Sequence, residues 1–332
     1  MTVFADADAK LAELEERIAA LENVTPPPPP RVRLRWRPPA TPGNIVNITQ
    51  PGTYTFPSGQ DVLIKPNVTS STGGRIELRG GRHRVIIGGH AKLTGGTDPI
   101  GILVEAGDEG GETHIEGMYF ETVNALTFRT NQQVTIENCH AKVADAAAHA
   151  DLMQSWKGQK SKGIRVHRFT GHSAFTFLSD LTDEPGVVFG TYTPAFWELY
   201  DVDLHGPQGL VNWMGSPAHC VWRGDNLWLE TSFEASGQRR SLDDQLRQHG
   251  EQYAPKYAGV QILDAAGTLL FTGAQGGTPA QAPGDIGKLP GHWLRYHQNP
   301  RLTMTWKWGV PPDGEFVPAA TVGVNYVSPG YL

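Results

Sequence analysis

The sequence predicts a mainly β protein: a parallel β-helix, preceded by an N-terminal coiled-coil helix and followed by a small C-terminal β module. Three observations lead to this fold class. The 332 residues include 39 glycines and 25 prolines, well above the roughly 12% average for these two residues in soluble proteins. Short apolar strands separated by turn residues recur about every 20 to 35 residues, the repeat length typical of solenoids. The first 25 residues follow a heptad pattern instead.

Residues 1–25 are expected to form a coiled-coil stalk or docking helix. Apolar residues recur at steps of three and four, which forms the seam of a coiled coil. The residues expected to mediate oligomerisation are Phe4, Leu11, Leu14, Ile18 and Leu21. Packing of this helix on its own domain is the alternative, but Pro26–Pro30 hold it away as a stiff polyproline rod. We therefore favour an oligomerising stalk.

Residues 26–43 are expected to form a proline-rich linker and a basic strand. Arginine occupies every second position of Arg31–Arg37, with apolar residues between, and this alternation is typical of a strand. The arginines either protect the edge of a sheet from aggregation or contact a polysaccharide or nucleic acid. Protection of the edge is the favoured interpretation.

Residues 44–232 are expected to form the parallel β-helix. In each repeat two strands are split by a small bend, for example at Glu116–Gly117, Asn138 and Gly224–Asn226, and a further strand follows after a loop. Stacking of those further strands aligns the side chains expected to point inward: Ile102, Leu126, Leu152, Phe175 and Leu210. An antiparallel sandwich is the alternative, but its usual Asn-Gly and Asp-Gly hairpin turns are absent from this region.

Residues 233–332 are expected to form a small C-terminal β module that caps the last coil. Ser241–Gly250 has an N-cap serine and a terminal glycine, which predicts a short helix. The pattern of Gly259–Thr272 predicts a hairpin, and that of Arg301–Trp308 an alternating strand.

Composition excludes several classes of protein. The net charge of −6 argues against a strongly basic face that binds nucleic acid. The two cysteines, Cys139 and Cys220, form neither a disulfide framework nor a four-cysteine zinc site, and both are expected to be buried thiols. The histidines lack a third ligand nearby in sequence, so we expect no metal and no cofactor. No apolar run is long enough to cross a membrane, so we expect no membrane insertion.

The order of coiled coil, proline hinge, β-helix and β-rich module resembles the receptor-binding tail spikes and tail fibres of tailed bacteriophages and of phage-like particles such as gene transfer agents. His149–Gln154 is similar to the His-x-Asp-x-x-Gln element of many pectate-lyase-like β-helices, and Phe316–Tyr331 looks like the terminus of such tail proteins. The resemblance implies a right-handed β-helix, a homotrimer, and a phage tail or baseplate protein bound at the N-terminus. It also implies host surface polysaccharide as the ligand, and a place in the virion tail after synthesis in the bacterial cytoplasm without a signal peptide.

Polysaccharide hydrolysis requires two carboxyl groups about 5 to 10 Å apart, a separation that outward residues on neighbouring coils can provide. The candidate catalytic residues are His149, Asp151, Asp180 and Glu105. The structural alternative is that His149 and Asp151 hydrogen-bond to each other or to a turn and that Gln154 joins an internal polar ladder. The candidate glycan-binding residues are Gln154, Trp156, Arg129 and Trp213.

The leading hypothesis is a tail fibre or spike that attaches the particle to its host by binding surface polysaccharide. One alternative is a polysaccharide depolymerase, either a hydrolase or a lyase, although a lyase would require a calcium-binding acidic cluster that the sequence does not clearly provide. A second alternative is a structural tail or decoration protein. Activity as an enzyme is thus left open, with binding alone preferred.

Overall fold

The computed structural model describes residues 33–97, 99–143, 151–156, 161–172, 176–181, 194–206, 210–212, 221–231, 260–263, 269–272, 294–295 and 304–331. The chain divides into two compact units, Met1–Leu34 and Arg35–Leu332. All described strands belong to the second unit, and they confirm that the protein is mainly β. Among the described residues, no helix has the length and apolar character needed to cross a membrane.

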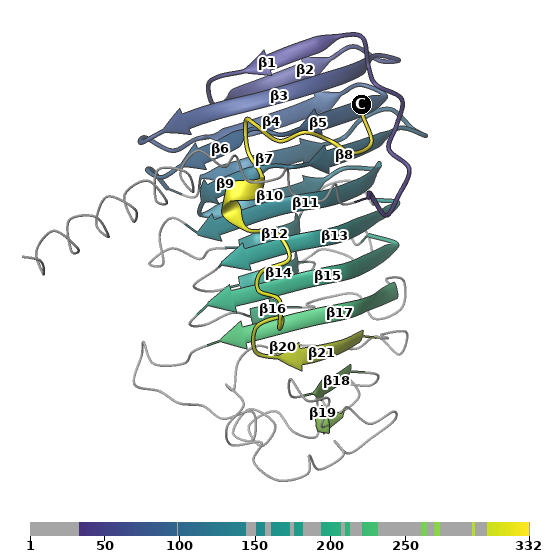
Figure 1. Ribbon diagram of the computed structural model, residues 1–332. Helices are drawn as coiled ribbons and strands as arrows, with labels where there is room; N and C mark the ends of the chain where they lie inside the picture. The colour runs from purple at the N-terminus through teal and green to yellow at the C-terminus, as the bar shows by residue number, and fades with distance from the viewer. Residues whose placement is uncertain are drawn as a thin grey trace, which may run out of the picture. The chain divides into compact units, whose positions relative to one another are not determined.

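The larger of two sheets, sheet A, contains thirteen of the described strands. They are β1 (Ile45–Ile48), β3 (Asp61–Ser70), β5 (His83–Ile87), β6 (His90–Leu93), β8 (Glu112–Glu116), β9 (Tyr119–Thr122), β11 (Gln133–Val143), β13 (Gly163–His172), β15 (Phe196–Gly206), β17 (Val221–Thr231), β18 (Val260–Leu263), β19 (Leu269–Thr272) and β21 (Met304–Trp308). Figure 1 shows the long strands β11, β13, β15 and β17 lying side by side.

Sheet B contains eight described strands. They are β2 (Gly52–Phe56), β4 (Arg75–Gly80), β7 (Ile100–Glu105), β10 (Asn124–Arg129), β12 (Asp151–Trp156), β14 (Thr176–Leu181), β16 (Leu210–Asn212) and β20 (Leu294–Arg295). Neighbouring strands pair in parallel in both sheets, except for the antiparallel pair β18 and β19. This pair and β21 confirm the hairpin and the alternating strand predicted for the C-terminal part of the chain.

One hydrophobic cluster draws on both sheets. In sheet A an aliphatic row follows the strand register through Ile64, Ile86, Ile115, Ile136, Val166 and Leu199, all fully buried. Each such side chain contributes about 1.5 to 3 kcal/mol by leaving water. A register slip of one residue would turn every one of these side chains to the opposite face, so the row holds the strands in register.

The predicted bends coincide with residues of left-handed backbone. Gly117 has φ of 68°, Asn138 of 52° and Asn226 of 54°. Arg168 and Asp201, at the equivalent positions of β13 and β15, have φ of 53° and 51°. Only glycine adopts this region without cost, although asparagine and aspartate tolerate it. The bend is therefore a property of the stacked strands, and Arg168 adopts it although its own type disfavours it.

The stacking predicted for sheet B is wrong by one residue at β12. Leu126 lies opposite Met153 instead of Leu152, and Met153 in turn lies opposite Leu178. Leu178 lies opposite Val211 instead of Leu210, and Phe175, expected in the same row, lies outside the described residues. Leu152 and Met153 are both fully buried, so the apolar pattern alone could not distinguish the two registers.

The chain beyond β21 returns across sheet A as an extended segment, which we call the C-terminal strap (residues 309–331). In Figure 1 it is the yellow segment that ends at the label C, near β5 and β8. Its only regular element among the described residues is a short 3-10 turn at Ala319–Thr321. The backbone N–H of Gly323 donates to the carbonyl of Gly117 at 2.8 Å, and Tyr326 Oη donates to Glu116 Oε1 at 2.7 Å. The strap thus contacts the bends of sheet A.

Candidate functional site

A row of charge crosses three neighbouring strands on the outer face of sheet A. Arg165 on β13 lies opposite Glu198 on β15, which lies opposite Arg223 on β17. Arg165 Nε donates to Glu198 Oε2 at 2.9 Å, and Arg223 pairs with the other oxygen. The Glu198 carboxylate is nearly buried, whereas the side chains of Arg165 and Arg223 are 33% and 50% exposed. One buried carboxylate therefore orients two guanidinium groups toward solvent.

Aromatic rings lie beside these guanidinium groups, and Phe196 lies near both of them. The Arg165 guanidinium lies 5.6 Å from the ring centroid of Trp36 and 5.6 Å from that of Phe196, and Arg223 lies 5.8 Å from that of Phe196. We call this set the aromatic-arginine surface. Its members are Arg35, Trp36, Arg165, Phe196, Tyr200 and Arg223.

Trp36 and Arg35 belong to this surface because the chain bends at these two residues. Their backbone N–H groups donate to the two oxygens of the Glu137 carboxylate, at 3.0 and 2.9 Å. The Arg35 guanidinium then lies 3.4 Å from the ring centroid of Tyr200. Residues 33–37 form no strand, although their alternation predicts one, because a side-chain carboxylate binds the amides that a strand ladder would use.

His167, whose ring lies next to Trp36, contacts two carboxylates. Its Nδ1 lies 3.0 Å from Glu137 Oε2 and its Nε2 lies 3.3 Å from Asp201 Oδ2. Burial opposes protonation of the ring, but the hydrogen bonds to Asp201 and Glu137 outweigh it and raise the pKa of His167. The pKa of Asp201 is lowered by the same hydrogen bond, against the effect of its own burial.

A ladder of rings follows the outer face of sheet A beyond the bends. His90, Tyr119 and His140 lie opposite one another on β6, β9 and β11, with ring centroids 5.6 Å apart at each step. His172 on β13 lies 5.3 Å from His140, and His205 on β15 lies 5.0 Å from His172. Four histidines and a tyrosine therefore form a continuous column.

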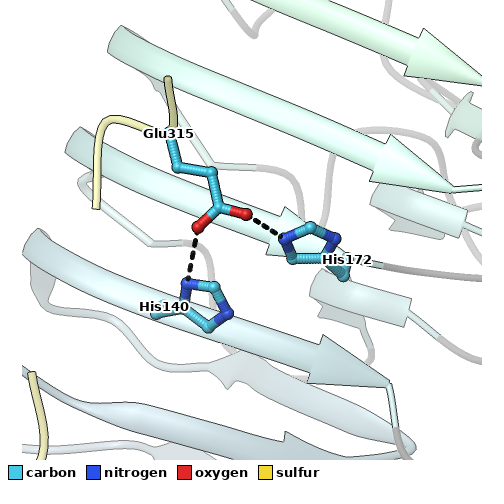
Figure 2. A group of neighbouring side chains, drawn as sticks. All are labelled: His140, His172 and Glu315. Atoms are coloured by element: carbon cyan, nitrogen blue, oxygen red, sulfur yellow. Dashed lines mark hydrogen bonds and ion pairs between the residues drawn. The ribbon is translucent and has the colours of Figure 1, made fainter. Parts of the chain in front are cut away.

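The strap places a carboxylate against this ladder (Figure 2). His172 Nε2 lies 2.9 Å from Glu315 Oε1, and His140 Nδ1 lies 3.9 Å from Glu315 Oε2. Burial and the neighbouring His205 lower the pKa of His172, and Glu315 only partly opposes them. The side chain of His140 is almost completely buried, while those of His172 and Glu315 are about one third exposed.

Asp203 fixes the strap beside this cluster. Its Oδ1 accepts hydrogen bonds from Thr170 Oγ1 at 2.7 Å and from the backbone N–H of Phe316 at 3.2 Å. Its Oδ2 lies 2.7 Å from His205 Nε2. The sequence neighbours of Glu315 are thus held by the same strands that carry the histidines.

Two of the predicted site residues, Asp151 and Gln154, lie together but are buried. Gln154 Nε2 donates to Asp151 Oδ2 at 2.9 Å, and Asp151 is only 2% exposed. It therefore does not line an open groove as we expected. Gln154 lies opposite Thr127 and not, as the predicted stacking required, opposite Phe128. Gln154 is buried and has a hydrogen-bond partner, but its place in an internal polar ladder stays a prediction.

The structure brings Glu105 and Arg129 together. They lie opposite each other on β7 and β10, with Glu105 Oε1 3.5 Å from Arg129 Nη1, as the predicted column required. Ser155, expected in the same column, lies opposite Phe128 instead. Asp180 lies within β14, opposite Ser155, and not on a loop as expected.

The remaining predicted site residues lie outside what the structure describes. This applies to His149, Trp213 and the oligomerisation residues Phe4, Leu11, Leu14, Ile18 and Leu21, and to the side chain of Trp156. Their roles stay predictions. The burial expected for Cys139 is confirmed, since the thiol is fully buried and burial raises its pKa, whereas Cys220 is not described.

Sequence reasoning missed both the aromatic-arginine surface and the histidine cluster. The histidines were visible as outward positions of predicted strands, and spacing along the chain gave no third ligand. Glu315, whose carboxylate completes the cluster, lies 143 residues from His172 in sequence, so only the position of the strap reveals it.

Comparisons of this chain with protein-family models, with curated proteins and with solved structures find no match.

Proposed function

We propose that this protein is a phage-type tail spike or fibre that attaches its particle to a host by binding cell-surface polysaccharide. The observation that carries the proposal is the aromatic-arginine surface. Rings stack on the apolar faces of sugars, while nearby polar groups bind their hydroxyl groups. Trp36, Phe196 and Tyr200 supply such rings on one outer face, beside three guanidinium groups.

A parallel β-helix is the architecture that we infer for the strands. Successive strands alternate between the two sheets from β2 to β5, and β3, β4 and β5 pair in parallel with the earlier strands β1, β2 and β3. Neighbouring strands of sheet A, for example, place one residue each in register, in the order Ile86, Ile115, Ile136 and Val166.

A right-handed coil, a homotrimer and docking to a tail or baseplate protein through residues 1–25 complete the proposal. A mass of three times the 36.2 kDa chain by light scattering would support the trimer, and a monomer at high concentration would contradict it.

An acidic polysaccharide fits the aromatic-arginine surface best. Guanidinium groups bind carboxylates in bidentate geometry, and Arg165 and Arg223 each turn an exposed side chain toward solvent while Glu198 orients it. The chain as a whole carries a net charge of −6, so the local arginines, and not overall charge, would attract such a glycan.

Binding without cleavage is preferred to the depolymerase alternative. Asp151 is nearly buried and bonds to Gln154, and Glu105 already pairs with Arg129. A general acid must come within hydrogen-bond reach of its substrate, which neither arrangement favours.

Glycan binding by variants of the full chain tests the proposal. A glycan array would identify a ligand, and calorimetry would then compare Arg165→Ala and Tyr200→Leu with the unmodified protein. We expect each variant to bind at least about fivefold more weakly, since a charge-assisted hydrogen bond or a stacked ring contributes about 1 to 3 kcal/mol.

The matched control is Arg79→Ala. Arg79 and Arg75 on β4 flank the buried Glu77 as Arg165 and Arg223 flank Glu198, but they lie on sheet B. Unchanged binding by Arg79→Ala would locate the glycan on the aromatic-arginine surface. If all three variants bind equally well, the glycan binds elsewhere and the proposed site is wrong. If no glycan binds to the unmodified protein, a structural tail or decoration protein becomes the better explanation. New reducing ends or unsaturated sugars after incubation would instead favour the depolymerase.

A further inference from the structure

His140, His172 and Glu315 present potential metal-ligand atoms to one point between sheet A and the strap. One ligand atom from each residue lies within 4.8 Å of the others. Figure 2 shows both imidazole rings directed at the Glu315 carboxylate, one from β11 and one from β13. The three residues come from separate segments that the fold brings together.

The spacing of these atoms suits a single ion. Two ligands bound at about 2.1 Å from an ion lie about 3.0 to 3.4 Å apart in octahedral or tetrahedral geometry. The His172 Nε2 to Glu315 Oε1 distance is 2.9 Å and the His140 Nδ1 to Glu315 Oε2 distance is 3.9 Å, so these distances bracket that range. Small rotations of the partly exposed Glu315 and His172 side chains would suffice.

We propose that His140, His172 and Glu315 bind a first-row divalent transition metal ion such as Zn²⁺, and that the ion ties the C-terminal strap to sheet A. Two imidazoles and one carboxylate suit Zn²⁺ and its neighbours, whereas Ca²⁺ and Mg²⁺ require more oxygen ligands. A water molecule or the Val317 carbonyl, whose oxygen lies 2.8 Å from His140 Nδ1, supplies the fourth ligand.

Binding requires a change of tautomer at His140. A carbonyl oxygen only accepts hydrogen bonds, so His140 Nδ1 carries the proton when it bonds to Val317. Coordination through Nδ1 moves that proton to Nε2, and the ring stays neutral. His172 coordinates through Nε2 with its proton on Nδ1, so both imidazoles bind as neutral ligands.

Neighbouring residues hold the ligands in place. The ring of Tyr119 stacks on His140 at an interplanar angle of 8°, and His205 stacks on His172. Asp203 and Thr170 bind the backbone N–H groups of Phe316 and Val317, which limits the movement of Glu315. Such outer contacts orient metal ligands and affect affinity strongly.

The competing explanation is a hydrogen-bonded cluster without metal, in which His172 donates to Glu315 and His140 donates to Val317. Calorimetry with Zn²⁺ on the full chain, produced without a polyhistidine tag, distinguishes the two. We expect one saturable site per chain, and a visible ligand-field spectrum when Co²⁺ replaces Zn²⁺. Glu315→Gln and His172→Asn should each weaken binding at least about tenfold.

The matched control is His83→Gln, which removes a partly exposed histidine from β5, outside the cluster. Unfolding curves in a chelator would verify that every variant folds, and anomalous scattering at the zinc edge would locate the ion without any substitution. Amide exchange of residues 315–323 should slow severalfold when Zn²⁺ is added to the unmodified chain or to His83→Gln, but not when it is added to the cluster variants. Absence of saturable binding, equal binding by the cluster variants, or an ion located elsewhere would overturn the proposal. It is independent of glycan binding, because the aromatic-arginine surface shares none of the three ligands.

Discussion

The ring of Tyr326 occupies the space where a side chain on Gly117 would lie. A Cβ atom built on Gly117 would overlap that ring, and the backbone there is left-handed, with φ of 68°. The hydroxyl of the same tyrosine donates to Glu116 and accepts a hydrogen bond from Asn138 Nδ2 at 3.0 Å. Absence of a side chain at residue 117 therefore allows the strap to lie flat on the bend.

Gly117→Ala is expected to destabilise the protein by about 2 to 4 kcal/mol. About 1 to 2 kcal/mol comes from forcing alanine into left-handed backbone, and the rest comes from displacing Tyr326. Urea unfolding measures the free energy, and amide exchange at Gly323 and Tyr326 measures whether the strap has loosened.

The control for this substitution is Gly110→Ala. Gly110 also has positive φ, at 84°, but nothing lies within 4 Å of the position of its Cβ. We expect it to lose only the backbone contribution, about 1 to 2 kcal/mol. Equal losses for both variants would mean that Tyr326 does not press on the bend.

His167 is expected to make stability depend on pH. Its pKa is raised in the folded chain, so its contribution is fully present below the unfolded value of about 6.5 and is lost as pH rises through the folded value. The groups that face it are Glu137 on β11, Asp201 on β15 and the ring of Trp36. His167→Gln should therefore lose less stability than the unmodified chain between about pH 6 and pH 8, measured by urea unfolding in the presence of a chelator.

His90→Gln provides a comparison of opposite sign. Burial, followed by Lys92, lowers the pKa of His90, so its contribution is present above the unfolded pKa and is lost as pH falls through the folded value. This variant should therefore lose more stability than the unmodified chain on going from about pH 6 to pH 8. If the stability of the unmodified chain and that of His167→Gln changed with pH in the same way, the proposal that a protonated His167 bridges Glu137 and Asp201 would be contradicted.

Local sequence patterns predicted most of the described strands and the bends at glycine or asparagine, but not the bends at Arg168 and Asp201. Glycine or asparagine between two apolar-polar alternations indicates a left-handed residue, and Gly117, Asn138 and Asn226 follow this rule. Patterns failed where two neighbouring residues fit the core equally well, as at Leu152 and Met153. The register of such a strand then depends on loop geometry and on the adjacent strand, and the local apolar pattern specifies neither of these.

The candidate sites could not be predicted for a different reason. Glu137 binds the amides of Arg35 and Trp36 across about one hundred residues of chain, and Glu315 reaches His172 from a similar distance in sequence. No spacing rule covers contacts that depend on where the chain returns after its last strand. Outward histidines and arginines on adjacent repeats were the only available signal.

Arg84 shows that the interior of the chain also contains a polar cluster. It lies in the row of Val62 and Val134, which are core positions, and is fully buried. Its guanidinium donates to four neutral oxygens, of Leu78, Thr113, Thr130 and Gln132. Burial lowers the pKa of Arg84 to about 10, so the group still carries its charge at neutral pH.

Arg84→Ala is expected to cost about 3 to 5 kcal/mol, because it leaves a cavity and removes the donor from several buried acceptors. Arg84→Met fills most of the space and no longer buries a charge, so it should cost less, about 1 to 3 kcal/mol. The control is Arg82→Met, since Arg82 pairs with Asp61 at the surface, and we expect a change within about 1 kcal/mol. Urea unfolding of the three variants measures these differences, and a loss for Arg84→Met as large as that for Arg84→Ala would show that the hydrogen bonds of the guanidinium, and not its volume, stabilise this part of the core.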